Sequence, residues 1–144
     1  MTLTECIRYA ILHKKVDIAD SMAKTFKVPD TRLWRIKVKA LADAGMYDEL
    51  SVLSNKRSPI GYTPFVDACA ENKNNHEAAH YLPKVKNEEE RMRVAMKWKL
   101  YEGAFPCAAK LKDMDVLMEI LNYTRNEQLK KDVRLAIQTI DGNN

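Results

Sequence analysis

The chain has 144 residues, of which 46% are hydrophobic and 31% charged, and its net charge is +4. This composition is typical of a folded globular module and excludes a disordered chain. Only four glycines and five prolines occur, which favours helices throughout. The mild positive charge permits an acidic partner but does not demand nucleic acid. No stretch approaches the roughly 18 apolar residues of a membrane span.

The three cysteines, Cys6, Cys69 and Cys107, show no paired spacing and lie among apolar or small residues. A disulfide framework normally needs an even number of cysteines, and a cysteine metal site needs close pairs. We therefore interpret all three as small hydrophobic residues, which fits a reducing compartment.

Capping and stop signals divide the chain into ten expected helices. Thr2 and Glu5 form a capping-box pair ahead of the first helix, and Gly45 closes the third as a C-terminal cap. The first helix is expected to end near 13–15. The next three cover about 16–27, 30–44 and 47–53, the fifth runs from 63 into the polar run 71–75, and the sixth covers about 76–82. A seventh helix follows at about 88–101, and then a short helix that is interrupted by Gly103 and Pro106. The last two helices start at 113 and at 124–127, and the final one ends near 140.

Residues 56–65 are the only place where prolines and a glycine cluster. Pro59 stops a helix that arrives from the N-terminal side, and Gly61 allows the backbone to turn back. Thr63 is expected as the N-cap of the next helix, with Pro64 at its first position. We interpret this segment as a structural buckle between two helical halves, with Ile60, Tyr62 and Phe65 packed beneath it.

A faint repeat runs through these helices. Turns fall near Lys15, Gly45, Asn75 and Gly103, which gives separations of 30, 30 and 28 residues. A period near thirty, with small residues in the helix after each turn, is typical of stacked helical hairpins, although an irregular helical bundle stays open. We therefore predict an all-α fold, an α-solenoid of stacked antiparallel hairpins, as a single domain over 1–140 followed by a disordered tail at 141–144.

His76, Glu77 and His80 match the zinc-hydrolase pattern, in which two histidines one turn apart bind the metal and the glutamate acts as a base. However, Pro83 cuts the helix short and no third ligand is evident. No glycine-rich phosphate loop or activated nucleophile is recognisable either. We therefore expect no metal, no cofactor and no catalysis, and keep a zinc-dependent hydrolase as a distant alternative.

The expected third helix carries the most suggestive surface. Arg32, Arg35 and Lys39 recur at three and four residues on one face, beside Trp34. A tryptophan beside arginines is typical of a partner-docking surface. The plainer interpretation is a solvated basic face with Trp34 folded into the core. Nucleic acid is a weaker alternative, because aspartates bracket the stripe and aromatic residues are sparse.

Three motifs in order carry a resemblance to a known family. They are Val-Pro-Asp-Thr-Arg-Leu-Trp at 28–34, Ala-Leu-Ala-Asp at 40–43, and Ser-Pro-Ile-Gly-Tyr-Thr-Pro-Phe-Val at 58–66. With them the chain resembles, from Thr4 to about Leu121, the C-terminal region of the class C vacuolar protein sorting subunit sixteen. The last motif is the most specific of the three. Where that family often has a second aromatic or large apolar residue after the tryptophan, this chain has Arg35.

The resemblance implies the α-solenoid end of a much longer subunit of the HOPS and CORVET tethering complexes, which join late endosomes and lysosomes or vacuoles. In that family the C-terminal part docks a Sec/Munc-type (SM) protein that guides SNARE assembly. A sister adaptor shares this domain and recruits its own SM protein, which is the close alternative. We therefore expect a non-enzymatic scaffold, cytoplasmic and peripheral on those membranes, with the SM protein and other core subunits as partners. The expected partner-binding residues are Arg32, Trp34, Arg35 and Lys39.

Overall fold

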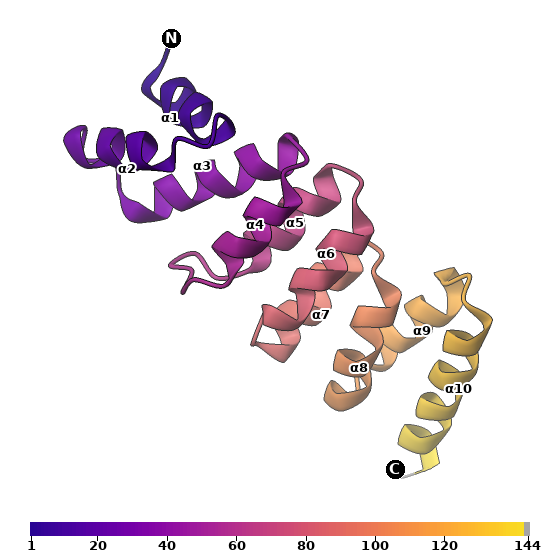
Figure 1. Cartoon of the computed structure of the whole chain (residues 1–144). Coiled ribbons are helices and arrows are strands. Elements are labelled where there is room, and N and C mark those ends of the chain that lie inside the picture. The colour runs from indigo at the N-terminus through magenta and orange to yellow at the C-terminus, as the bar shows by residue number, and fades with distance from the viewer. Residues whose placement is uncertain (143–144) are drawn as a thin grey trace. The chain divides into compact units, whose positions relative to one another are not determined.

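The computed structural model describes residues 1–142, and all regular structure within them is helical (Figure 1). This confirms the predicted all-α fold of stacked helical hairpins. The helices are α1 (Leu3–Leu12), α2 (Val16–Thr25), α3 (Asp30–Asp43), α4 (Tyr47–Ser54), α5 (Thr63–Glu71), α6 (Asn75–Tyr81), the 3₁₀ helix η1 (Leu82–Lys84), α7 (Glu88–Lys97), α8 (Tyr101–Leu111), α9 (Met114–Tyr123) and α10 (Glu127–Gly142). They form two compact units, Met1–Tyr81 and the remainder from Leu82. The single domain over 1–140 stays a prediction.

The first unit contains three helical hairpins, α1–α2, α3–α4 and α5–α6. Within it, α1 packs on α3 and α3 packs on α5, so the first helices of successive hairpins stack side by side. The core of this unit contains fully or almost fully buried side chains, among them Ile7, Val38, Leu50, Phe65, Val66 and Tyr81. This stacking of successive hairpins is the arrangement that the repeat predicts.

The second unit contains η1 and the hairpins α7–α8 and α9–α10, with α8 packed against both α9 and α10. Leu117, Ile120 and Val133 are fully buried in it, and Cys107 is 1% exposed. Asp113 caps α9 as predicted, since its Oδ1 accepts the Val116 backbone amide at 3.1 Å. The last helix continues past the predicted end near 140, and residues 143–144 of the predicted tail lie outside the described residues.

Six helices end in the same left-handed C-terminal turn. In each, the left-handed residue donates its amide to the carbonyl three residues back, and the next residue donates to the carbonyl five residues back. This is the Schellman motif, which satisfies carbonyl groups that a helix end leaves without partners. The residues with positive φ are Lys14, Lys27, Gly45, Lys73, Lys99 and Lys112. Three of the four predicted turns fall within two residues of these positions.

The fourth predicted turn, at Gly103, is wrong. The chain turns at Lys99, after α7 has ended at Lys97, and both Gly103 and Pro106 lie inside α8. The glycine serves helix packing instead: a Cβ atom at position 103 would lie 2.3 Å from Cδ2 of the buried Leu82. The missing side chain therefore lets α8 approach η1 closely.

The buckle between α4 and α5 is held by local hydrogen bonds. Gly61 has a φ of +70°, as its role in the turn requires. The Tyr62 hydroxyl donates toward the backbone carbonyl oxygens of Ser54, at 3.0 Å, and Lys56, at 2.8 Å. The segment is therefore pinned to the end of α4.

Phe65 lies fully buried beneath this buckle, as predicted, whereas Ile60 and Tyr62 are only partly buried. The ring centroid of Phe65 lies 5.3 Å from that of Tyr62, 5.4 Å from that of Tyr81 and 6.5 Å from that of Trp34. These distances suit tilted aromatic pairs, which add to the energy of burial. Helix α5 begins at Thr63 with Tyr62 as its N-cap, so the predicted cap at Thr63 is one residue late.

Candidate docking surface

Helix α3 lies between α1 and α5, so most of its circumference is covered. Six of its residues are buried, namely Leu33, Trp34, Val38, Ala40, Leu41 and Ala42. The predicted cations Arg32, Arg35 and Lys39 occupy the remaining exposed side. We call these three residues the α3 basic face.

The two arginines of this face lack an acidic partner within the described residues. Arg32 Nη2 donates a hydrogen bond to Thr4 Oγ1 of α1 at 2.9 Å. Arg35 makes no ion pair or side-chain hydrogen bond with any of residues 1–142. Both guanidinium groups therefore keep a full positive charge that a carboxylate from outside the chain could bind in a bidentate fork.

Lys39 differs from the two arginines because it forms an ion pair with Asp43 of its own helix. Its Nζ lies 3.3 Å from Asp43 Oδ2, and Arg8 Nη2 of α1 lies 3.2 Å from the same oxygen. Asn72, at the end of α5, donates to the other oxygen at 2.9 Å. The hydrogen bond from Asn72, supported by Arg8 and Lys39, lowers the pKa of Asp43 against the opposing effect of burial. Sequence reasoning missed Arg8, because no local signal relates it to a residue 35 positions away.

Trp34 lies in the core. Only 8% of it is exposed, and its ring packs near the ring of Phe65. This position agrees with the plainer interpretation of the sequence, in which the indole folds inward. Trp34 therefore fixes α3 against α5 from beneath.

The zinc-hydrolase pattern lies on α6, which has seven residues and ends at Tyr81. His76 and His80 are exposed, and His80 packs edge-on against the ring of Tyr81 at 5.2 Å. Among residues 1–142 no group of three or more histidine, cysteine, aspartate or glutamate side chains is gathered as a metal site would require. The structure therefore brings no third ligand to the two histidines.

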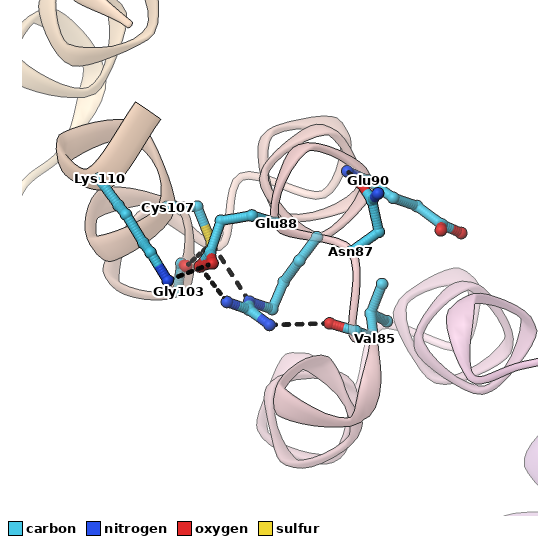
Figure 2. A network of polar contacts seen from close by, with 8 residues as sticks. Val85, Asn87, Glu88, Glu90, Gly103, Cys107 and Lys110 are labelled. Atoms are coloured by element: carbon cyan, nitrogen blue, oxygen red, sulfur yellow. Dashed lines mark hydrogen bonds and ion pairs between the residues drawn. The ribbon is translucent and has the colours of Figure 1, made fainter. Parts of the chain in front are cut away.

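A second cluster of charged groups lies in the second unit and links α7 to α8 (Figure 2). The guanidinium of Arg91 binds Glu88, donates to the Val85 carbonyl oxygen at 2.8 Å and lies 3.2 Å from Cys107 Sγ. Lys110 reaches across from α8 to Glu88 at 3.3 Å. Each charged group of the cluster contacts another group of the cluster, which indicates a structural role in fixing these two helices.

None of the helices within residues 1–142 combines the length and the apolar character needed to cross a bilayer. A protein-family model described as "Vps16, C-terminal region" matches residues 1–140. The chain is 38% identical over 126 residues to a vacuolar protein sorting-associated protein 16 homolog of Dictyostelium discoideum, covering 81% of this chain and 15% of that protein.

Two further relatives carry similar names. The chain is 31% identical over 121 residues to the Drosophila melanogaster homolog, covering 83% of this chain and 14% of that protein. It is 27% identical over 125 residues to vacuolar protein sorting-associated protein 16 of Saccharomyces cerevisiae, covering 85% of this chain and 16% of that protein. It thus spans about one sixth or less of the length of these curated relatives. The match over residues 1–140 shows that the chain belongs to the Vps16 C-terminal region family.

Proposed function

We propose that this chain is a non-enzymatic docking segment of a vacuolar protein sorting subunit in a HOPS- or CORVET-type tethering complex. In this proposal the α3 basic face binds a Sec/Munc-type SM protein and so supports SNARE-mediated fusion. The observation that carries it is the family match over residues 1–140, together with an exposed row of cations on α3. Other core subunits of the complex are the further partners we propose.

The chemistry of the face favours a partner that presents carboxylates. A guanidinium donates two parallel hydrogen bonds to a carboxylate, so Arg32 and Arg35 can each fix the position of one acidic side chain. Losing one member of such a pair is costly once the pair is desolvated, because the other charge stays buried without a partner. Trp34 contributes from beneath, by holding α3 rigidly against α5 through Phe65.

A sister adaptor that recruits a related SM protein is the alternative function. Both proteins would present the same helical domain, so the fold does not separate them. Which SM protein binds is the discriminating observation. In either case we propose that the protein works at late endosomal, lysosomal or vacuolar membranes through its partners.

The test is co-purification of the tagged chain with each SM protein of the same cell, at a salt concentration of about 0.15 M, where exposed charges are screened beyond ~8 Å. The proposal expects one SM protein to be retained in equimolar amount. A matched variant, Arg134→Glu on the exposed side of α10, should retain it equally. Failure of every SM protein of the cell to bind the folded chain would contradict the proposed function.

A further inference from the structure

The positive charge of the α3 basic face continues onto α1. We propose that the docking surface spans both helices, with Arg8 as its fourth cation, and that Asp43 is an internal counter-ion against which the partner's carboxylates must compete. This inference rests on the proposed function, because it concerns the same surface. It adds a residue and a regulating contact that neither the motifs nor the family match assign.

Two contacts along the seam between α1 and α3 define this surface. Thr4 accepts a hydrogen bond from Arg32, and one turn further along α1, Arg8 meets Asp43. The intervening residue Ile7 is fully buried, so this stretch of α1 is anchored in the core. The anchored helix therefore presents Arg8 on the same side as the cations of α3.

The charges on this surface do not balance. Of the four cations, Arg8 and Lys39 contact the carboxylate of Asp43. Arg32 and Arg35 have no acidic partner within residues 1–142. One oxygen of Asp43 meets both Arg8 and Lys39, while the other meets the neutral Asn72. The one negative charge is thus shared between two cations and neutralises neither fully.

Both shared cations remain open to a partner. The side chain of Arg8 is 36% exposed and that of Lys39 is 63% exposed, whereas that of Asp43 is 27% exposed. A carboxylate from a partner protein can therefore approach Arg8 and Lys39 from solvent, where it competes with the partly exposed Asp43. The chemistry that recognises such a surface is an acidic protein patch with several carboxylates, one for each arginine of α3 and one for the pair that Asp43 holds.

Two substitutions that break the same ion pair separate this proposal from a purely structural contact. Arg8→Gln removes a cation of the surface, and Asp43→Asn removes the internal competitor, while both new side chains can still form hydrogen bonds. We expect Arg8→Gln to weaken binding of the SM protein at least about threefold and Asp43→Asn to strengthen it by a similar factor, with both effects shrinking as salt is added. A contact that only holds α1 against α3 would change affinity in the same direction for both variants, or in neither.

The measurement is a binding titration by calorimetry at low and physiological salt, with thermal melts to show that each variant is folded. Arg134→Gln on α10 is the matched control and should leave affinity unchanged. A fluorescent oligoglutamate peptide serves as a second probe that needs no SM protein. If the SM protein does not bind the wild-type chain, the proposed function fails, and the peptide still decides this inference. Equal affinity of the peptide for wild type, Arg8→Gln and Asp43→Asn at low salt would overturn it.

Discussion

Arg32 on α3 and Thr4 on α1 are joined by a hydrogen bond of 2.9 Å, from the guanidinium Nη2 to the threonine Oγ1. Because Thr4 carries no charge, the contact orients Arg32 without neutralising it. The guanidinium is thus held in place in the free protein, so part of the conformational entropy that the proposed docking would cost is already lost.

We expect Arg32→Glu to abolish the proposed docking of the SM protein at about 0.15 M salt, since the reversed charge would repel a carboxylate of that partner. The helical circular dichroism signal and the melting temperature should stay nearly unchanged, because the side chain is exposed. If the α3 basic face were merely solvated, the effect would be small and would vanish at this salt concentration.

Thr4→Val is the control for this experiment, because it removes the hydroxyl and keeps the shape of the side chain. It should weaken docking much less than Arg32→Glu does. A pull-down with the SM protein compares the three proteins. Undiminished binding of a well-folded Arg32→Glu variant would remove Arg32 from the docking surface.

The lysines with positive φ at helix ends should lower stability, and replacing one of them by glycine tests this. Lys73 has a φ of +59° at the end of α5, a conformation that costs a residue with a Cβ atom about 1–2 kcal/mol. Lys73→Gly should therefore raise the free energy of unfolding by about 0.5–1 kcal/mol, after the loss of the lysine's favourable interaction with the helix dipole. Urea denaturation measures the change.

The converse substitution is Gly45→Ala. Gly45 has a φ of +69°, and a Cβ there would meet no atom within 4 Å, so the cost is purely one of backbone conformation. The free energy of unfolding should fall by about 1 kcal/mol. Equal stability of wild type and both variants would show that these turns relax out of the left-handed region.

The helix ends show which parts of the fold could be predicted from the sequence. Capping signals act within three residues, so Thr2 with Glu5 and Asp113 predicted helix starts that the structure confirms. Lysine is not a turn residue by propensity, so the left-handed conformation of Lys27 and Lys112 was not predicted, although helix boundaries were expected beside both residues. Hydrogen bonds to buried carbonyl groups of the preceding helix, such as those of Ala23 and Ala108, hold these turns instead.

In the candidate site, too, local spacing could be predicted from the sequence, whereas contacts between distant helices could not. Helical spacing alone placed Arg32, Arg35 and Lys39 on one exposed face. The ion pair between Arg8 and Asp43 joins two helices that become neighbours only after folding, so periodicity could not predict it. The partners of a charged side chain on one helix can come from helices that lie far away in the sequence.

Phe65 tests the structural role of the buckle. Its ring is fully buried among three other aromatic rings, so Phe65→Ala should lower the free energy of unfolding by about 3–5 kcal/mol. Phe26→Ala is the matched control, because Phe26 is 62% exposed and should lose little. Thermal stability that is equal in the two variants would argue that the Phe65 ring is exposed in solution and would reopen the buckle as a binding surface.

Tyr81→Phe is not expected to lower the free energy of unfolding, in contrast to Phe65→Ala. The side chain is fully buried, and its hydroxyl forms no hydrogen bond within residues 1–142. Burial, followed by the charges of Cys69 and Glu77, raises the pKa of Tyr81, and Ser51 is the smallest influence, in the opposite direction. Because a buried hydroxyl without a partner costs about 1–3 kcal/mol, Tyr81→Phe should leave stability unchanged or raise it. A loss above about 1 kcal/mol on urea denaturation would mean that the hydroxyl is bonded in solution.

The last prediction concerns the pH dependence of stability, through Asp43. The hydrogen bond from Asn72, together with Arg8 and Lys39, lowers the pKa of Asp43 from its usual value of 3.8. A carboxyl group whose pKa is lower in the folded state contributes stability that is fully present above the pKa of the unfolded chain. This stability is lost as the pH falls through the folded-state pKa. The difference in free energy of unfolding between wild type and Asp43→Asn should therefore be constant near neutral pH and should shrink below about pH 4. Carboxyl chemical shifts in an NMR titration measure the pKa directly, and Asn72→Ala should raise it, because that variant removes the largest cause of the shift. A wild-type pKa at or above the usual value, unmoved by Asn72→Ala, would show that the three contacts around Asp43 do not persist in solution.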